Sequence, residues 1–165
     1  PASTMAMNKS ALIKNIIAAL TEQLARYAGA ASTARAEAID EENQAEDKYD
    51  TRGLEASYLA AGQSRQMAET ASALQQFGAL TAIRFSPETA IDIGALVELK
   101  TRREQNLYFI GPSGGGTEVE HEKRTVLVLT PQSPLGGQLM GRKQGERLKI
   151  KVGGLVDEYT IAAVS

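Results

Sequence analysis

The sequence contains no cysteine, no tryptophan and only one histidine, His121. Without cysteine the chain has no disulfides, no thiol catalysis and no Cys-ligated zinc or iron–sulfur centre. A single histidine also argues against a His-rich metal site and a His-centred catalytic triad. No apolar run approaches the roughly 20 residues of a membrane span, and no signal-peptide pattern is present. A cytoplasmic protein without a membrane partner is therefore expected.

Proline is also scarce: five are present, and none lies between Pro1 and Pro87. The same stretch is rich in alanine, glutamate, glutamine, arginine and leucine, which favour long helices. From about Gly94 onward, β-branched and aromatic residues alternate with polar ones between glycines and prolines. The composition therefore predicts an α+β protein with a helical N-terminal half and a mainly β C-terminal half.

Two long helices are expected in the first half. One apolar stripe at three- and four-residue spacing defines the first helix, with Ser10 as its expected N-cap. The members of that stripe are Leu12, Ile13, Ile16, Ile17, Leu20, Leu24 and Tyr27. A second stripe predicts a helix from about Leu54 to Phe77, ended by Gly78. Two such helices with a short polar connection most simply form an antiparallel hairpin.

The tip of this hairpin is strongly acidic. Seven carboxylates stand against one lysine, Lys48, between residues 37 and 50: Glu37, Asp40, Glu41, Glu42, Glu46, Asp47 and Asp50. One interpretation is a solvated acidic surface, because crowded carboxylates repel each other unless water or a cation separates them. The other is a Mg²⁺ ligand set, since Mg²⁺ prefers one or two carboxylates plus water. The run lacks the spacing of an EF-hand loop.

The second half is predicted to be a small antiparallel β domain with a short helix or turn over residues 133–141. Leu148, Ile150 and Val152 alternate with lysines, as in a half-buried strand. The expected strands are Ala95–Lys100, Asn106–Gly111, Glu118–Glu122 running on to Thr125–Leu129, Arg147–Val152 and Val156–Val164.

Two features of this half could be mistaken for sites. The stretch Gly111–Thr117 is glycine-rich, but it lacks the Gly-Lys-Ser/Thr ending of a phosphate-binding loop, so a flexible hairpin loop is expected. His121 lies between Glu120 and Glu122, and an exposed histidine without a ligand role is expected there.

The order of motifs in the second half resembles the Gre transcript-cleavage factors of bacterial RNA polymerase. The most specific motif is a Ser133-Pro-Leu-Gly136 turn followed by the glycine-punctuated segment Leu139–Glu146. Matching segments of the same order are Ile93–Leu99, Tyr108–Gly111 and the closing strands to Val164, about 70 residues in all. In the helical half, Leu54–Ala61 is similar to the family's Glu-Asn-Ala-Glu-Tyr-x-Ala-Ala stretch.

The resemblance implies an antiparallel coiled-coil hairpin followed by an FKBP-like antiparallel β domain. The expected parts are residues 1–6, as an artificial addition or a disordered end, a hairpin at 7–78, a linker at 79–93 and the β domain at 94–165. It also implies a partner, the rim of the secondary channel of bacterial RNA polymerase, which the turn Ser133, Pro134, Leu135 and Gly136 would contact.

The implied activity is stimulation of RNA cleavage by the polymerase, and not independent catalysis. Acidic tip residues of such factors help to hold a Mg²⁺ ion that the polymerase active site supplies, close to the nascent RNA 3′ end. No cofactor of the protein's own is expected.

The tip departs from the family pattern. The family carries an Asp and a Glu just before the tyrosine-containing stretch, and alignment on Tyr58 places Thr51 and Leu54 at those positions. The preceding stretch is also about a dozen residues longer. The nearest replacement is the pair Asp47 and Asp50, expected as the shared Mg²⁺ ligands, with Glu46 and Glu55 as further tip carboxylates.

Two alternatives remain open from the sequence. One is a channel-binding regulator without cleavage activity, which the displaced acidic pair favours. The other is an FKBP-like interaction module or prolyl isomerase, for which the β half offers few aromatic residues: Phe85, Tyr108, Phe109 and Tyr159. Sequence-specific DNA binding is not supported, because basic residues occur only in ordinary surface pairs.

Overall fold

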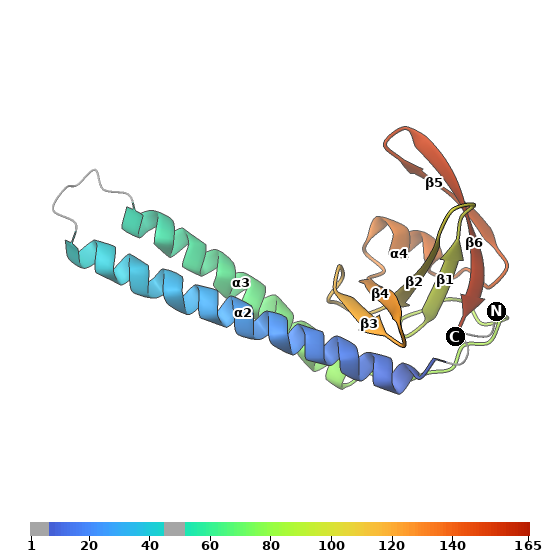
Figure 1. Ribbon diagram of the computed structural model, residues 1–165, viewed down its shortest axis with the longest axis horizontal. Coiled ribbons are helices and arrows are strands. Elements are labelled where there is room, and N and C mark those ends of the chain that lie inside the picture. The colour runs from blue at the N-terminus through green and yellow to red at the C-terminus, as the bar shows by residue number, and fades with distance from the viewer. Residues whose placement is uncertain (1–6, 45–51) are drawn as a thin grey trace. The chain divides into compact units, whose positions relative to one another are not determined.

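The computed structural model describes residues 7–44 and 52–165 (Figure 1). The expected fold class is confirmed, with two long helices followed by a β domain. Residues 1–6, expected to be an added or disordered end, lie outside the described residues. The helices are α2 (Lys9–Gln44), α3 (Arg52–Gly78) and α4 (Pro134–Leu139). The strands are β1 (Leu96–Lys100), β2 (Gln105–Ile110), β3 (Glu118–His121), β4 (Arg124–Leu129), β5 (Arg147–Val152) and β6 (Leu155–Val164).

Helix α2 begins one turn earlier than its apolar stripe. The Asn8 side chain accepts a hydrogen bond from the backbone N–H of Ala11 at 3.0 Å, and so satisfies one of the free donors of the first turn. Ser10, the expected N-cap, is already inside the helix. Asparagine and serine are both good N-caps, and the apolar stripe alone did not distinguish them.

The chain divides into two compact units. One unit contains the described residues up to Ala19 together with Gln75–Ser165, and the other is Leu20–Leu74. The start of α2, up to Ala19, and the end of α3, from Gln75, are therefore in the same unit as the sheet. Their large apolar side chains, such as Ile16 and Phe77, are fully buried, whereas most of the buried residues in the intervening parts of the helices are alanines.

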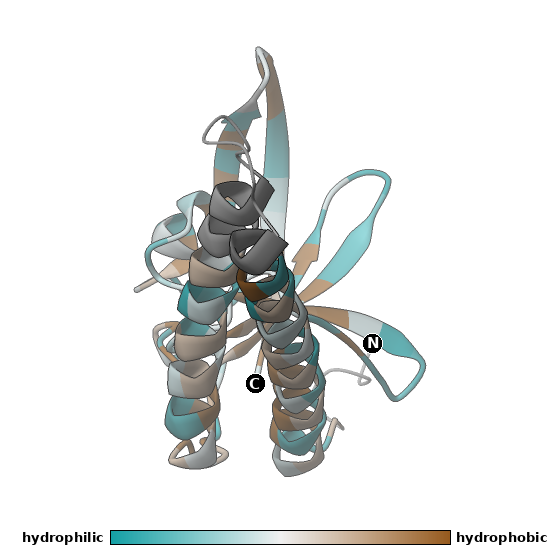
Figure 2. Cartoon of the chain, turned by 90° about the vertical axis from the view of Figure 1, so that its left-hand side faces the viewer, coloured by the Kyte–Doolittle hydropathy of each residue, from teal (hydrophilic) through white to brown (hydrophobic). Residues whose placement is uncertain are grey.

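The unit Leu20–Leu74 is a pair of helices packed through small side chains. Its buried residues include Leu20, Thr70 and a set of alanines: Ala31, Ala34, Ala38, Ala60 and Ala73. Arg35 on α2 donates a hydrogen bond to the Ser64 hydroxyl on α3 at 3.0 Å. Figure 2 shows apolar and polar residues interspersed around the helices. In the described part of the chain, no helix is long and apolar enough to cross a membrane.

The β domain is a six-stranded sheet with the order β3-β4-β2-β1-β6-β5. The expectation of an antiparallel sheet is wrong for one pair, because β2 and β4 are parallel. The expected continuous run from β3 to β4 is instead a tight two-residue turn, in which Glu122 and Lys123 have φ values of 49° and 65°. The chain turns back there and places β4 between β3 and β2.

Buried apolar side chains lie on both faces of this sheet. On the face that α4 covers, here called the α4 face, Leu139 joins Val97, Leu99, Ile110 and Ile161 in one hydrophobic cluster. On the opposite face, Phe77 at the end of α3 packs against Phe109 of β2, with ring centroids 6.1 Å apart. The sheet is therefore the middle layer of its unit.

Candidate functional site

The segment Ser133–Gly136 forms the turn that starts α4. The Ser133 side-chain oxygen accepts a hydrogen bond from the backbone N–H of Gly136 at 3.1 Å and donates one to the Thr130 carbonyl at 2.7 Å. Pro134 occupies the first helical turn, where its missing N–H costs nothing. The helix is six residues long, so its position depends on this cap and on buried Leu139.

Gly136 is required by packing rather than by backbone conformation. A Cβ added there would overlap the Thr130 carbonyl group and would lie 2.7 Å from the Ser133 hydroxyl oxygen. Pro134 is exposed and Leu135 is half-buried against the hydrophobic cluster, whereas Gly136 is buried. The turn therefore exposes the rigid ring of Pro134 to solvent, whereas Gly136 in the same turn is buried.

A second loop lies beside this turn. Because β2 and β4 are parallel, the loops that follow them, Gly111–Thr117 and Thr130–Ser133, leave the sheet at the same end. The backbone N–H of Gly111 donates to the Leu129 carbonyl at 2.8 Å. A Cβ on Gly115 would lie 3.2 Å from the Thr130 methyl carbon. The two loops therefore form one continuous surface.

The sequence suggested that the glycine-rich segment is a hairpin loop, and this prediction is wrong. It connects β2 to β3, which are separated in the sheet by β4. The glycines have separate reasons. A Cβ at Gly111 would overlap Phe77 and Val128, Gly115 lies close to Thr130, and Gly114 and Gly116 have positive φ values of 73° and 89°.

The predicted tip carboxylates Glu46, Asp47 and Asp50 lie outside the described residues. Glu55 is part of α3. Among the residues that the structure describes, no group of three or more histidine, aspartate or glutamate side chains could hold a metal ion.

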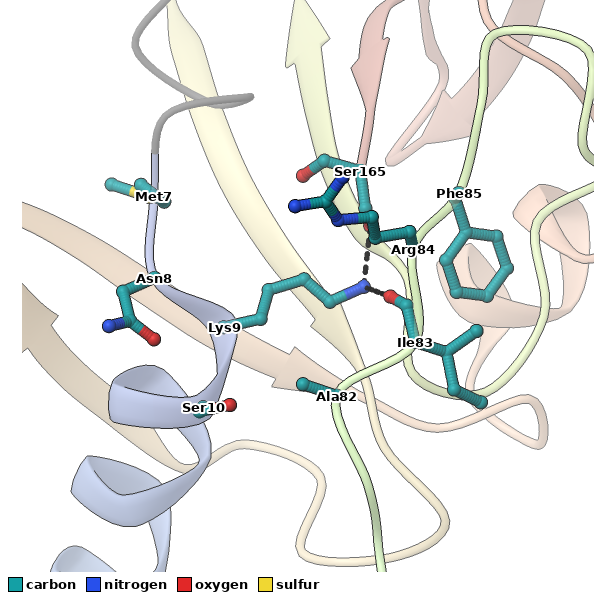
Figure 3. A pocket seen from close by; sticks show the side chains of 9 residues that line it. All are labelled: Met7, Asn8, Lys9, Ser10, Ala82, Ile83, Arg84, Phe85 and Ser165. Atoms are coloured by element: carbon teal, nitrogen blue, oxygen red, sulfur yellow. Dashed lines mark hydrogen bonds between the residues drawn. The ribbon is translucent and has the colours of Figure 1, made fainter.

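A second candidate site surrounds Lys9, in the first turn of α2 (Figure 3). It is a cavity of about 580 Å³ between the helix start and the segment Ala82–Phe85. The Lys9 ammonium donates hydrogen bonds to the carbonyls of Ile83 and Ser165, the latter at 2.8 Å, and lies 4.7 Å from the centroid of the Phe85 ring. Burial lowers the pKa of Lys9 to about 8. Both acceptors are backbone carbonyls, and they come from two different segments of the chain. Lys9 therefore links the start of α2 to both segments.

The candidate aromatic residues of a prolyl isomerase divide between two faces of the sheet, with Phe85 in the same cluster as Tyr108 and Tyr159. Phe109 faces Phe77, whereas the neighbouring Tyr108 packs with Tyr159 against the cluster on the α4 face. Burial raises the pKa of the Tyr108 phenol, and the nearby Tyr159 and Glu104 raise it further. These residues fill two different faces of the sheet instead of lining one pocket.

His121 is buried, contrary to the expectation of an exposed side chain. It is 7% exposed, and its Nδ1 atom accepts a hydrogen bond from the Asn15 side-chain amide at 2.8 Å. The polar neighbours of His121 gave the wrong signal, because Val119 and His121 share the sheet face toward α2 while Glu118 and Glu120 point away.

The sequence matches no protein-family model and no curated protein. Solved structures do match. GreA factor homolog 1 (Gfh1) of Thermus aquaticus has 20% identity and a TM-score of 0.39 over 88% of this chain and 90% of that one. Elongation factor GreA/GreB of Nitrosomonas europaea has 20% identity and a TM-score of 0.37, over 72% of this chain and 95% of that one.

The chain is similar to Gre-type transcription factors of known structure. Gfh1 of Thermus thermophilus shows the same relation, at 19% identity and a TM-score of 0.35 over 90% of this chain. The Ser133–Gly136 turn, on which the Gre resemblance of the sequence rests, is the capped start of α4.

Proposed function

We propose that this protein is a Gre-type factor that binds the secondary channel of bacterial RNA polymerase and stimulates cleavage of backtracked RNA. The observation that carries the proposal is the capped turn Ser133–Gly136, in which Pro134 is exposed and a Cβ at the buried Gly136 would overlap the Thr130 backbone. A preformed turn loses little conformational entropy on docking.

The helical pair suits the second part of this function. Helices of 36 and 27 residues extend about 54 Å and about 40 Å at 1.5 Å per residue, long enough to carry a tip into a channel. Alanine packing keeps such a pair slender, because small side chains allow the backbones to approach closely.

The tip residues Asp47 and Asp50, with Glu46 and Glu55 nearby, would hold a Mg²⁺ ion shared with the polymerase. A bound Mg²⁺ activates water and neutralises charge on the phosphate that is attacked. The protein itself would position the ion and would be no independent enzyme, and it would act in the cytoplasm, where the polymerase works.

A second function is favoured by one observation in the sequence. Thr51 and Leu54 stand where the family's acidic pair is expected, and neither can bind a metal as a carboxylate does. In that function the protein occupies the channel and regulates transcription without cleavage.

The test is RNA cleavage in a purified backtracked elongation complex with Mg²⁺, with and without the protein. Asp47→Ala/Asp50→Ala should abolish the stimulation, while the matched control Glu37→Ala/Asp40→Ala, which removes the same charge from α2, should retain it. Pro134→Glu should weaken docking, because it charges the exposed turn without disturbing the helix start. The control Gln105→Glu adds the same charge at the other end of β2.

Competition with an established channel-binding factor separates the two functions. Competition without cleavage supports the regulator. Neither competition nor cleavage contradicts both functions and leaves only a shared fold.

A further inference from the structure

Strand β5 (Arg147–Val152) is an open edge of the sheet. In the sheet order it is the last strand, and within the described part of the chain it pairs only with β6 (Figure 1). An edge strand presents unpaired backbone N–H and C=O groups that another strand can complete.

The β5–β6 turn determines which residues carry these free groups. The turn has two residues, Gly153 and Gly154, with φ values of 58° and 86°, and Val152 pairs with Leu155 next to it. In such a hairpin the closing pair is hydrogen-bonded, and alternate residues then point their backbone groups inward and outward. The outward groups of β5 therefore belong to Arg147, Lys149 and Lys151.

These three residues also carry exposed cationic side chains on one face of the sheet. We call them the basic edge. The residues between them, Leu148 and Ile150, are 4% and 9% exposed and belong to the hydrophobic cluster on the α4 face. Backbone hydrogen-bonding capacity and positive charge thus coincide at every second position of β5.

The neighbouring strand supplies little compensation. Glu158 lies opposite Lys149, and its carboxylate is 3.8 Å from the Arg147 guanidinium, in a pair whose side chains are 52% and 74% exposed. An ion pair this exposed is worth little. One acid against three cations leaves the basic edge with a charge of +2 in a chain whose formal net charge is −2.

We propose that the basic edge binds an extended acidic segment of a partner protein, which adds to the sheet as a further strand beside β5. Main-chain hydrogen bonds would supply affinity, and alternate side chains would supply specificity. Carboxylates opposite Arg147, Lys149 and Lys151 form favourable cross-strand pairs. Residues between them lie beside Leu148 and Ile150, so they are apolar. The recognised pattern is therefore acid–apolar alternation.

Charge and surface chemistry favour this occupant over two others. A second copy of β5 would place cations opposite cations, which is destabilising. A nucleic acid strand would find phosphate contacts but no base-stacking surface, because β5 has no aromatic residue and Tyr159 packs on the other face. This proposal does not depend on the function proposed above.

Binding is measured with the full chain and a fluorescently labelled hexapeptide of alternating glutamate and valine, at low salt. The control peptide alternates lysine and valine. We expect binding of the acidic peptide only, weakened at least about tenfold by Lys149→Glu/Lys151→Glu. The matched variant Lys14→Glu/Arg65→Glu makes the same charge change on exposed positions of the helices and should bind as the unaltered chain does.

Amide hydrogen exchange tests strand addition itself. The acidic peptide should slow exchange at the N–H groups of Arg147, Lys149 and Lys151 and leave those of Leu148 and Ile150 unchanged. Absence of binding at about 1 mM peptide overturns the proposal, as does equal binding of the lysine peptide or binding without slowed exchange.

Two further results would assign the edge to another occupant and so overturn the proposal. One is displacement of the peptide by a single-stranded oligonucleotide that binds without slowing exchange. The other is self-association that Glu118→Lys/Glu120→Lys abolishes, since these exposed acids lie on β3, the opposite edge of the same sheet.

Discussion

The Ser133 hydroxyl oxygen accepts the backbone N–H of Gly136 at 3.1 Å, and this bond defines the exposed turn ahead of α4. Gly136→Ala should destabilise the fold more than Ser133→Ala does, because the new methyl group overlaps the Thr130 backbone. We expect a loss of about 1–3 kcal/mol of unfolding free energy for Gly136→Ala and about 1 kcal/mol for Ser133→Ala. Urea denaturation of both variants measures this, and an equal or smaller cost at Gly136 would contradict the packing argument.

Phe77 should be the helical residue on which the sheet unit depends most. Its side chain is fully buried and packs against Phe109. Phe77→Ala should cost about 3–5 kcal/mol, since it removes the ring and leaves a cavity. Thermal unfolding gives the value. Alanine at the exposed neighbour Gln76 is the control, and a similar small effect for both would show that the ring contact is unimportant.

Lys9 should make stability rise with pH between about 8 and 10.5. Burial lowers its pKa to about 8 in the folded protein, against 10.5 for an ordinary lysine. In this window the unfolded chain keeps a proton that the folded chain has released, so the free energy of unfolding increases with pH. Urea denaturation of the unaltered chain and of Lys9→Met isolates the effect as a difference that grows across the window. A constant difference would mean that Lys9 keeps its ordinary pKa.

Two helical glycines should be replaceable with a gain in stability. A Cβ added at Gly29 or Gly62 meets no atom within 4 Å, and neither residue has a positive φ. Alanine at either position should stabilise the helical pair by about 0.5–1 kcal/mol, because glycine loses more backbone entropy on folding. Circular dichroism during thermal unfolding checks this. Destabilisation would indicate a close contact at that face of the helix.

In the neutral form of His121, the proton should lie on Nε2. The Asn15 amide donates to Nδ1, which therefore has to carry a lone pair. Nitrogen chemical shifts of the imidazole ring distinguish the two tautomers directly. A proton on Nδ1 would show that the Asn15 carbonyl, not its amide nitrogen, faces the ring.

Much of the fold could be predicted from local patterns. The alternation of Leu148, Ile150 and Val152 with charged residues gave the bounds of β5 as the structure has them, and the proline-free first half gave two long helices. Local patterns identify an element because each element buries one face, and that burial repeats at the element's own period.

Long-range pairing was less accessible. Nothing local to β2 or β4 distinguishes a parallel partner from an antiparallel one, so the mixed sheet was missed. The same reason applies to His121, whose hydrogen-bond partner Asn15 is 106 residues away in the sequence. Lys9 was missed because its burial depends on carbonyls at Ile83 and Ser165.

The candidate site followed the same division. Ser133–Gly136 was singled out by its resemblance to the Gre family, and the structure confirms that a short helix starts there. Its contact with the polymerase stays a prediction. The role of Asp47 and Asp50 stays a prediction, since it depends on which carboxylates converge across the tip. The basic edge needed the sheet order, because the alternating lysines of β5 read alike in an edge strand and in a half-buried inner strand.

The position of β6 has a consequence for folding of the protein during translation. This strand lies between β1 and β5, so one of the two neighbours of β1 is synthesised about 60 residues after β1 itself. Until β6 has emerged, the nascent chain can form the helices and the pairs among β1 to β4, but one side of β1 stays open. Unpaired strands in nascent chains are prone to aggregate. Translation pauses before β6 should therefore increase misfolding more than pauses within the helical half.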